Sequence, residues 1–128
     1  MTSTPLADEQ FITLTTFKRD GTPVATTVWL VADGDHLLVT TLDTTGKAKR
    51  IRHTTRVVMV PSSRTGEVAE GATPVEGSAT LFQDELDLKR LGDLLVEKYG
   101  LLARAMFATR KLTRKDDNRI GIRIAPAV

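Results

Sequence analysis

Cysteine is absent from this sequence of 128 residues. Without thiolates the chain cannot form a disulfide framework, a cysteine-ligated zinc or iron–sulfur site, or a thiol nucleophile. Histidine is scarce as well, since His36 and His53 are the two imidazoles and no HExxH or comparable ligand spacing surrounds them. We therefore expect no metal site and interpret both histidines as solvated or structural residues.

Long hydrophobic runs are also missing, and no stretch approaches the ~18 apolar residues of a membrane-spanning helix. The first ten residues contain neither a basic cluster nor an apolar segment, so they do not resemble a secretory signal. The lack of cysteine is compatible with a reducing compartment. These observations predict a cytoplasmic protein with no membrane partner.

The common catalytic motifs are missing too. No G-x-S-x-G frame surrounds a serine, no G-x-G-x-x-G follows a predicted strand, and there is no Walker loop. These absences argue against serine hydrolases and against the commonest nicotinamide and nucleoside triphosphate folds. The catalytic residues are therefore unknown from sequence, and an enzyme of this composition would depend on a bound cofactor.

The composition that remains is that of an ordinary globular domain, with 41% hydrophobic and 27% charged residues. Its length corresponds to one domain, so we expect residues 1–128 to form a single cofactor-binding unit. Eighteen basic and sixteen acidic residues give a net charge of +2. A charge this small does not by itself indicate nucleic-acid binding.

Hydrophobic periodicity predicts a mainly β fold with helices. The expected strands are 11–17, 24–32, 36–42, 56–61, 75–82 and 119–125, and the expected helices are 45–55, 85–99 and 101–112. Tight turns join the first three strands, which favours antiparallel pairing. The apolar run 56–61 suggests a strand buried on both faces. We predict six strands curled into a small barrel, with a short basic helix and two later helices.

The segment between Asp43 and Glu67 contains no acidic residue and six basic ones. In it, a strand that ends in hydroxyl side chains passes through a glycine into the short basic helix. Free N–H groups and the positive end of the dipole favour an anion at a helix start, and hydroxyls add donors. A phosphate site and a solvated basic surface both explain this pattern. The residues at the helix start are Thr40, Thr41, Thr45 and Gly46.

A helical wheel separates the basic side chains of this helix. Lys47 lies beside the face that carries Ala48 and Ile51, and Arg50, three residues further on, borders the same side. Lys49 points away from that face. Lys47 is therefore the side chain best placed to reach a ligand held against the barrel, with Arg50 beside it.

Trp29, on the second predicted strand, is the single tryptophan. It fits the floor of a ring-binding cleft, and it fits a core position equally naturally. Threonines at 26, 27, 40 and 41 could present hydroxyls to a heterocycle, although threonine is also a common strand residue. Both interpretations stay open on the residues alone.

Three runs occur in a characteristic order: G-T-P-V-A-T-T-V-W-L-V (21–31), T-T-L-D-T-T-G-K-A-K-R-I-R (40–52) and R-V-V-M-V-P (56–61). This ordered set resembles the flavin and deazaflavin oxidoreductases of the split β-barrel class, the relatives of pyridoxamine 5′-phosphate oxidase. The similarity is greatest to the actinobacterial branch that uses coenzyme F420. It extends from about residue 11 to residue 82, and more loosely through the final strand, and implies an FMN-binding split barrel.

The resemblance implies that Lys47 and Arg50, and less directly Lys49, bind the cofactor's ribityl phosphate. It implies that the second and third strands line the ring and the ribityl chain, and that the end of the buried strand adds contacts. Together with the helix start, the expected cofactor-binding residues are Thr27, Val28, Trp29, Thr40, Thr41, Thr45, Gly46, Lys47, Lys49, Arg50, Pro61 and Ser62.

The activity implied by the resemblance is that of an F420H2-dependent reductase, which transfers hydride from the reduced deazaflavin to an unsaturated small-molecule acceptor. A homodimer with cofactors at its interface is implied as well. Two alternatives remain, namely an FMN- or FAD-binding oxidoreductase of the same fold and a non-catalytic cofactor- or lipid-binding protein. We do not expect nucleic-acid binding, because base-stacking aromatics make up only 5% of the chain.

Overall fold

The computed structural model describes residues 6–7, 9–42, 45–68, 70–100 and 119–127. The described elements, in chain order, are β1 (Phe11–Phe17), β2 (Pro23–Trp29), β3 (Val31–Asp33), β4 (His36–Leu42), α1 (Gly46–His53), β5 (Arg56–Pro61), β6 (Val75–Phe82), α2 (Glu85–Tyr99) and β7 (Arg119–Pro126). The predicted helix 101–112 lies outside the described residues.

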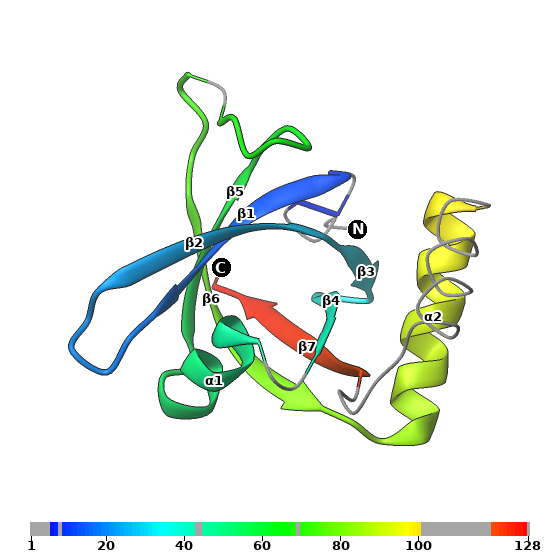
Figure 1. Cartoon of the computed structure of the whole chain (residues 1–128). Helices are drawn as coiled ribbons and strands as arrows, with labels where there is room; N and C mark the ends of the chain where they lie inside the picture. The colour runs from blue at the N-terminus through cyan, green and yellow to red at the C-terminus, as the bar shows by residue number, and fades with distance from the viewer. Residues whose placement is uncertain (1–5, 8, 43–44, 69, 101–118, 128) are drawn as a thin grey trace.

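All seven strands belong to one sheet in the order β2-β1-β5-β6-β7-β4-β3, and every neighbouring pair is antiparallel. The sheet curls around a hydrophobic core, and α1 lies across one end of the curl (Figure 1). Side chains alternate along each strand, so that Ile12 and Leu14 of β1 pack inward with Met59 and Ile122. The predicted mainly β, barrel-like architecture with antiparallel pairing is confirmed.

The strand predicted at 24–32 is in fact two strands, which is why the structure has seven strands and not six. The chain bends at Leu30, whose side chain is fully buried, so that β2 pairs with β1 while β3 pairs with β4 at the opposite edge of the sheet. The hydroxyl of Tyr99 and the ammonium of Lys98 both donate to the Leu30 carbonyl. The carbonyl at the bend is thereby satisfied from α2.

The expectation that 56–61 is buried on both faces is wrong. In β5 the side chains alternate, with Val57 and Met59 buried in the core and Val58 and Val60 partly exposed on the outer face. An apolar run does not distinguish a doubly buried strand from one whose outer face is only partly covered. The outer-face side chains of Val58 and Val60 therefore remain partly accessible in the single chain.

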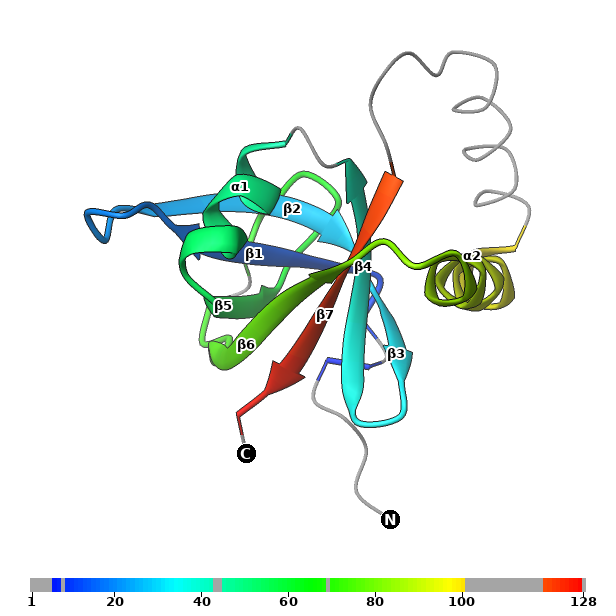
Figure 2. The ribbon, with the colours of Figure 1, turned by 90° about the horizontal axis from the view of Figure 1, so that it is seen from below.

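Helix α2 covers the outer face of the sheet at the β3–β4 edge (Figure 2). Asp84 caps it by accepting from the Asp87 amide, and Gly100 ends it at φ 64°. Leu91 and Leu95 are fully buried against that face, as the predicted stripe requires. Neither of the two described helices has the length and apolar character needed to cross a membrane.

Candidate functional site

The start of α1 is built by two threonine hydroxyls. The hydroxyl of Thr45 donates to the Leu42 carbonyl at 2.9 Å and accepts from the Ala48 amide at 3.4 Å, which makes it the N-cap. Thr41, at the end of β4, lies 3.2 Å away from it, oxygen to oxygen. Because Thr45 has one hydroxyl proton and gives it to Leu42, Thr41 is the donor between them. The structure thus brings Thr41 and Thr45 together at the helix start.

Arg50 reaches back across this helix start. Its Nε donates to the hydroxyl of Thr16, which is fully buried on the inward face of β1. Its guanidinium lies so close to Gly46 that a β-carbon at residue 46 would be 2.6 Å from Nη1. The two Nη groups form no hydrogen bond with the described part of the chain, so they remain able to bind an anion.

Lys47 stands beside Arg50 in a half-buried position, as the helical wheel predicts. Burial, and then the neighbouring Arg50 charge, lower the pKa of the Lys47 ammonium. Within the described residues, neither side chain forms an ion pair with a carboxylate. Two adjacent cations at the positive end of a helix repel each other, and an anion bound between them would relieve that repulsion.

Lys49, one residue along from Ala48, is exposed and lies on the other side of α1. Ala48 and Ile51 point into the core and fix the rotation of the helix, which keeps Lys49 away from the barrel. It carries the same charge as Lys47 on the same helix without the burial. Lys49 is therefore a natural internal control for any role of Lys47.

The predicted residues of β2 lie further along the sheet from α1. Thr27 pairs with Thr13 of β1, three residues along the strand from Thr16, so it is offset from the Arg50 contact by about 10 Å. Val28 is buried in the core, so only its backbone can face a ligand. Because β2 is an edge strand, it has backbone groups on one side without a strand partner.

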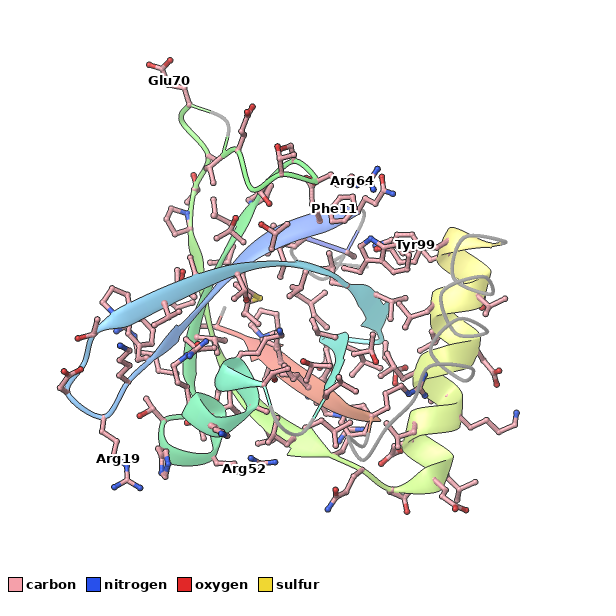
Figure 3. All side chains as sticks on the ribbon, in the orientation of Figure 1. Phe11, Arg19, Arg52, Arg64, Glu70 and Tyr99 are labelled. Carbon is pink, nitrogen blue, oxygen red and sulfur yellow. The ribbon has the colours of Figure 1, made fainter. Side chains whose placement is uncertain are left out.

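Trp29 is half-buried and stacks on Tyr99 of α2, with ring centroids 4.6 Å apart and planes inclined by 16°. Phe11 packs against it at 6.4 Å in a tilted arrangement. Figure 3 shows Phe11 and Tyr99 at this end of the sheet. One face of Trp29 therefore packs on a ring of the protein while the side chain stays partly exposed, and a role of Trp29 in cofactor binding stays a prediction.

We refer to Thr16, Thr41, Thr45, Lys47 and Arg50 as the α1 cluster. Thr40 and the end of β5 lie apart from it. Thr40 points to the opposite face of β4 from Thr41 and pairs with Gly121, and its hydroxyl is buried and has no hydrogen-bond partner among the described residues. Pro61 and Ser62 lie at the end of β5 remote from α1, where they line a cavity of about 440 Å³. The predicted residues therefore form a compact cluster at α1 and a dispersed set along the sheet.

The sequence reasoning did not single out Thr16, the residue that positions Arg50. A signal was present, because Ile12, Leu14 and Thr16 share the inward face of β1 and Thr16 is the polar member of that face. A hydroxyl at a core position has to find a partner, and here the partner is a charged side chain of α1.

The family comparison agrees with this architecture. A family model described as pyridoxamine 5′-phosphate oxidase matches residues 3–127. The chain belongs to the pyridoxamine 5′-phosphate oxidase family. No curated protein matches the chain significantly. This family includes oxidoreductases.

Solved structures share the fold at low sequence identity. A conserved hypothetical protein from Mycobacterium tuberculosis is 24% identical with a TM-score of 0.72, and the match covers 100% of this chain and 82% of that one. An F420 reductase is 19% identical with a TM-score of 0.64, over 96% and 91% of the two chains. An FAD-binding protein from Mesorhizobium loti is 14% identical with a TM-score of 0.64, over 96% and 83%. These similarities establish the split-barrel fold.

Proposed function

We propose that this chain binds coenzyme F420 and acts as an F420H2-dependent reductase of an unsaturated small molecule. The observation that carries the proposal is the pair Lys47 and Arg50, two adjacent cations without a carboxylate partner among the described residues. They lie at a helix start whose first residue, Gly46, has no side chain and so lets the Arg50 guanidinium lie close to the backbone. This is the chemistry that holds a phosphate group.

In this proposal each residue of the α1 cluster has a defined part. Lys47 and the Nη groups of Arg50 bind the phosphate of the cofactor, while Thr16 holds Arg50 in place through its Nε. Thr41 fixes the N-cap Thr45 and so the direction of the helix. Because these contacts exist before any ligand binds, little conformational freedom is lost on binding.

The reacting part of the cofactor would lie along β2, where the edge strand offers backbone donors and acceptors near Thr27 and Trp29. When bound, the reduced deazaflavin supplies the hydride. The chain's contribution is to orient the ring against the acceptor and to exclude water, which is worth up to ~7–11 kcal/mol where the alignment is good. No side chain has to act as a nucleophile, and a proton for the acceptor can come from solvent.

The proposal includes a homodimer. Its support is the outer face of β1 and β5, where Val58 and Val60 are only partly covered in the single chain. Pairing through this face would cover the valines and place two clusters near one interface. Light scattering should give twice the chain mass of 14.0 kDa; a monomer at working concentration would contradict it.

The test is to titrate the purified protein with F420, FMN and FAD and to measure binding by fluorescence. We expect F420 to bind with micromolar or tighter affinity and more tightly than FMN. Tighter binding of FMN or FAD would transfer the proposal to a flavin-dependent oxidoreductase of the same fold, in line with the FAD-binding neighbour from Mesorhizobium loti. Binding of F420 without reduction of any acceptor would support a non-catalytic carrier.

The proposal also places the protein in the cytoplasm, with which the absence of cysteine is compatible.

A further inference from the structure

A cavity lies at the end of β5 remote from α1, and the proposed phosphate site does not use it. Its volume is about 440 Å³, and it is open to solvent, since Ser63, Glu67 and Val68 of its lining are exposed. Six residues line it: Glu9, Pro61, Ser62, Ser63, Glu67 and Val68. We refer to it as the Glu9–Glu67 cavity.

The wall of this cavity is a structured turn. The Ser63 amide donates to the Glu67 carbonyl at 2.9 Å, and the Glu67 amide donates to the Ser63 hydroxyl at 3.1 Å. The Gly66 amide donates to the Ser63 carbonyl, and Ser62 forms a β-bridge with Val68. These hydrogen bonds order the turn, and the carboxylates of the two glutamates are not needed for them.

The same turn lies against the strand that is expected to hold the cofactor ring. A β-carbon on Gly66 would be 2.8 Å from the hydroxyl of Thr27. Gly66 has φ +89°, a conformation that favours glycine, so the turn is shaped to make this close approach. A molecule in the Glu9–Glu67 cavity would therefore lie near the Thr27 region of β2.

The charges of the lining are of one sign. Glu9 and Glu67 are its two ionisable residues, while Pro61 and Val68, the latter 46% exposed, give it an apolar part. Among nearby cations, Arg64 is not part of the lining, and the Lys98 ammonium donates to the carbonyls of Ala7, Glu9 and Leu30. The cavity thus has the opposite charge from the α1 cluster and disfavours anions.

We propose that the Glu9–Glu67 cavity is the acceptor pocket, and that it selects molecules with an apolar body and a cationic nitrogen group such as an amidinium or ammonium. The acceptor role rests on the proposed function, because it requires the cofactor ring near Thr27. The preference for a cation rests only on the cavity itself. Carboxylate- or phosphate-bearing acceptors are expected to bind poorly there.

Three probes of the same shape test the preference directly: benzamidinium (+1), benzamide (0) and benzoate (−1). Each is titrated into ¹⁵N-labelled full-length protein, and amide shifts are followed by NMR. We expect benzamidinium to bind at least fivefold more tightly than benzamide and benzoate to bind most weakly. The largest shifts should occur at Ser62, Ser63, Glu67 and Val68.

Matched variants distinguish the effect of the charges that line the cavity from the effect of the protein's overall electrostatic field. The double variant E9Q/E67Q keeps the side-chain shape, and its benzamidinium preference should fall below twofold. E70Q removes one carboxylate charge, half of what the double variant removes, from an exposed residue of the same loop that does not line the cavity (Figure 3). Its preference should equal that of the unmodified protein. The ¹⁵N spectra of the variants confirm that each is folded.

The remaining measurement addresses the acceptor role. In F420-loaded protein, benzamidinium should change the cofactor fluorescence, and E9Q/E67Q should abolish that change. Equal affinity for the three probes, shifts elsewhere, or an equal effect of E70Q would overturn the cation site. An unchanged fluorescence would overturn the acceptor role. Failure of every cofactor titration with the benzamidinium preference intact would instead refute the proposed function and leave the cation site standing.

Discussion

The guanidinium of Arg50 occupies the space that a side chain at Gly46 would need, because a β-carbon there would lie 2.6 Å from Nη1. Gly46 is the first residue of α1, and its φ does not fall in the left-handed region. An alanine at this position is therefore compatible with the backbone and has the higher helix propensity. The conflict would be resolved by movement of the arginine side chain, which is flexible at its end.

Gly46→Ala should accordingly weaken cofactor binding without destabilising the fold. We expect the dissociation constant of the cofactor to rise about tenfold, the loss of one charge-assisted hydrogen bond. The free energy of unfolding in urea, measured without cofactor, should stay within about 0.5 kcal/mol of its original value. A variant that binds normally would show that Arg50 does not contact the ligand.

Lys47→Ala should weaken cofactor binding by about 1.5–3 kcal/mol, which is roughly tenfold to over a hundredfold in dissociation constant. The reason is that Lys47 is half-buried beside Arg50 and faces the barrel. Fluorescence titration at two salt concentrations measures the effect. The loss should persist at high salt, because a direct contact is screened less than a distant charge.

Lys49→Ala is the control for this measurement. It removes the same charge from the exposed side of α1 and should change the affinity by less than about 0.5 kcal/mol, apart from a term that disappears with salt. If both variants lose affinity equally and both losses vanish at high salt, α1 is a basic surface and the assignment of the phosphate site is wrong.

The lowered pKa of Lys47 also predicts how stability responds to pH. Burial, and then the Arg50 charge, hold the folded-state pKa below the reference value of 10.5. Between these two pKa values the unfolded chain binds more protons, so the free energy of unfolding rises with pH. At pH 7 the charged Lys47 thus opposes folding. Lys47→Met should raise the Tm of the ligand-free protein at pH 7, and this advantage should shrink as the pH rises towards 10.5.

Added inorganic phosphate provides the complementary arm of that experiment. An anion beside Lys47 favours the charged ammonium, so phosphate should raise the Tm of the unmodified protein and raise that of Lys47→Met much less. Thermal unfolding scans at pH 7 and pH 9.5, with and without phosphate, give the Tm of both proteins under each of the four conditions. A lower Tm for Lys47→Met without phosphate at pH 7 would show that the charged ammonium does not oppose folding.

Most helices and strands could be predicted from the sequence, because their local signals agree with the tertiary structure. In α2, the Asp84 cap, the stripe of Leu91 and Leu95 and the stop at Gly100 all occur as predicted. The break at Leu30 was not predictable from periodicity. Val24 to Ala32 is uniformly strand-forming, and the bend arises from pairing with different partners and from the donors of α2 at the Leu30 carbonyl.

For the candidate site, the helical wheel predicted the relation between Lys47, Arg50 and Lys49, because it depends on geometry within one helix. The partners across the fold were not predictable. The contact between Thr16 and Arg50 joins residues that are 34 positions apart. The packing of Tyr99 on Trp29 joins α2 to β2, which become neighbours only in the folded chain. Pro61 and Ser62, predicted to contact the cofactor, lie at the end of β5 remote from α1, and their role stays a prediction.

A final prediction concerns the contact between Gly121 of β7 and Phe82 of β6, a cross-strand pair. The Phe82 ring lies over the glycine, and a β-carbon at residue 121 would be 2.1 Å from its Cζ. Gly121→Ala should therefore destabilise the protein by about 1–3 kcal/mol through overpacking. Phe82→Leu removes the ring, and in the double variant the new methyl group can occupy the freed space. The double variant should be more stable than the sum of the two single losses predicts, by about 1 kcal/mol or more.

Gly34→Ala is the control for this coupling, because Gly34 has φ +63° and no heavy atom within 4 Å of the β-carbon position. Its cost comes from the backbone, so Phe82→Leu should add to it without coupling. Urea unfolding of the three single variants and the two double variants measures both couplings. Equal couplings in the two pairs would show that Phe82 does not restrict residue 121.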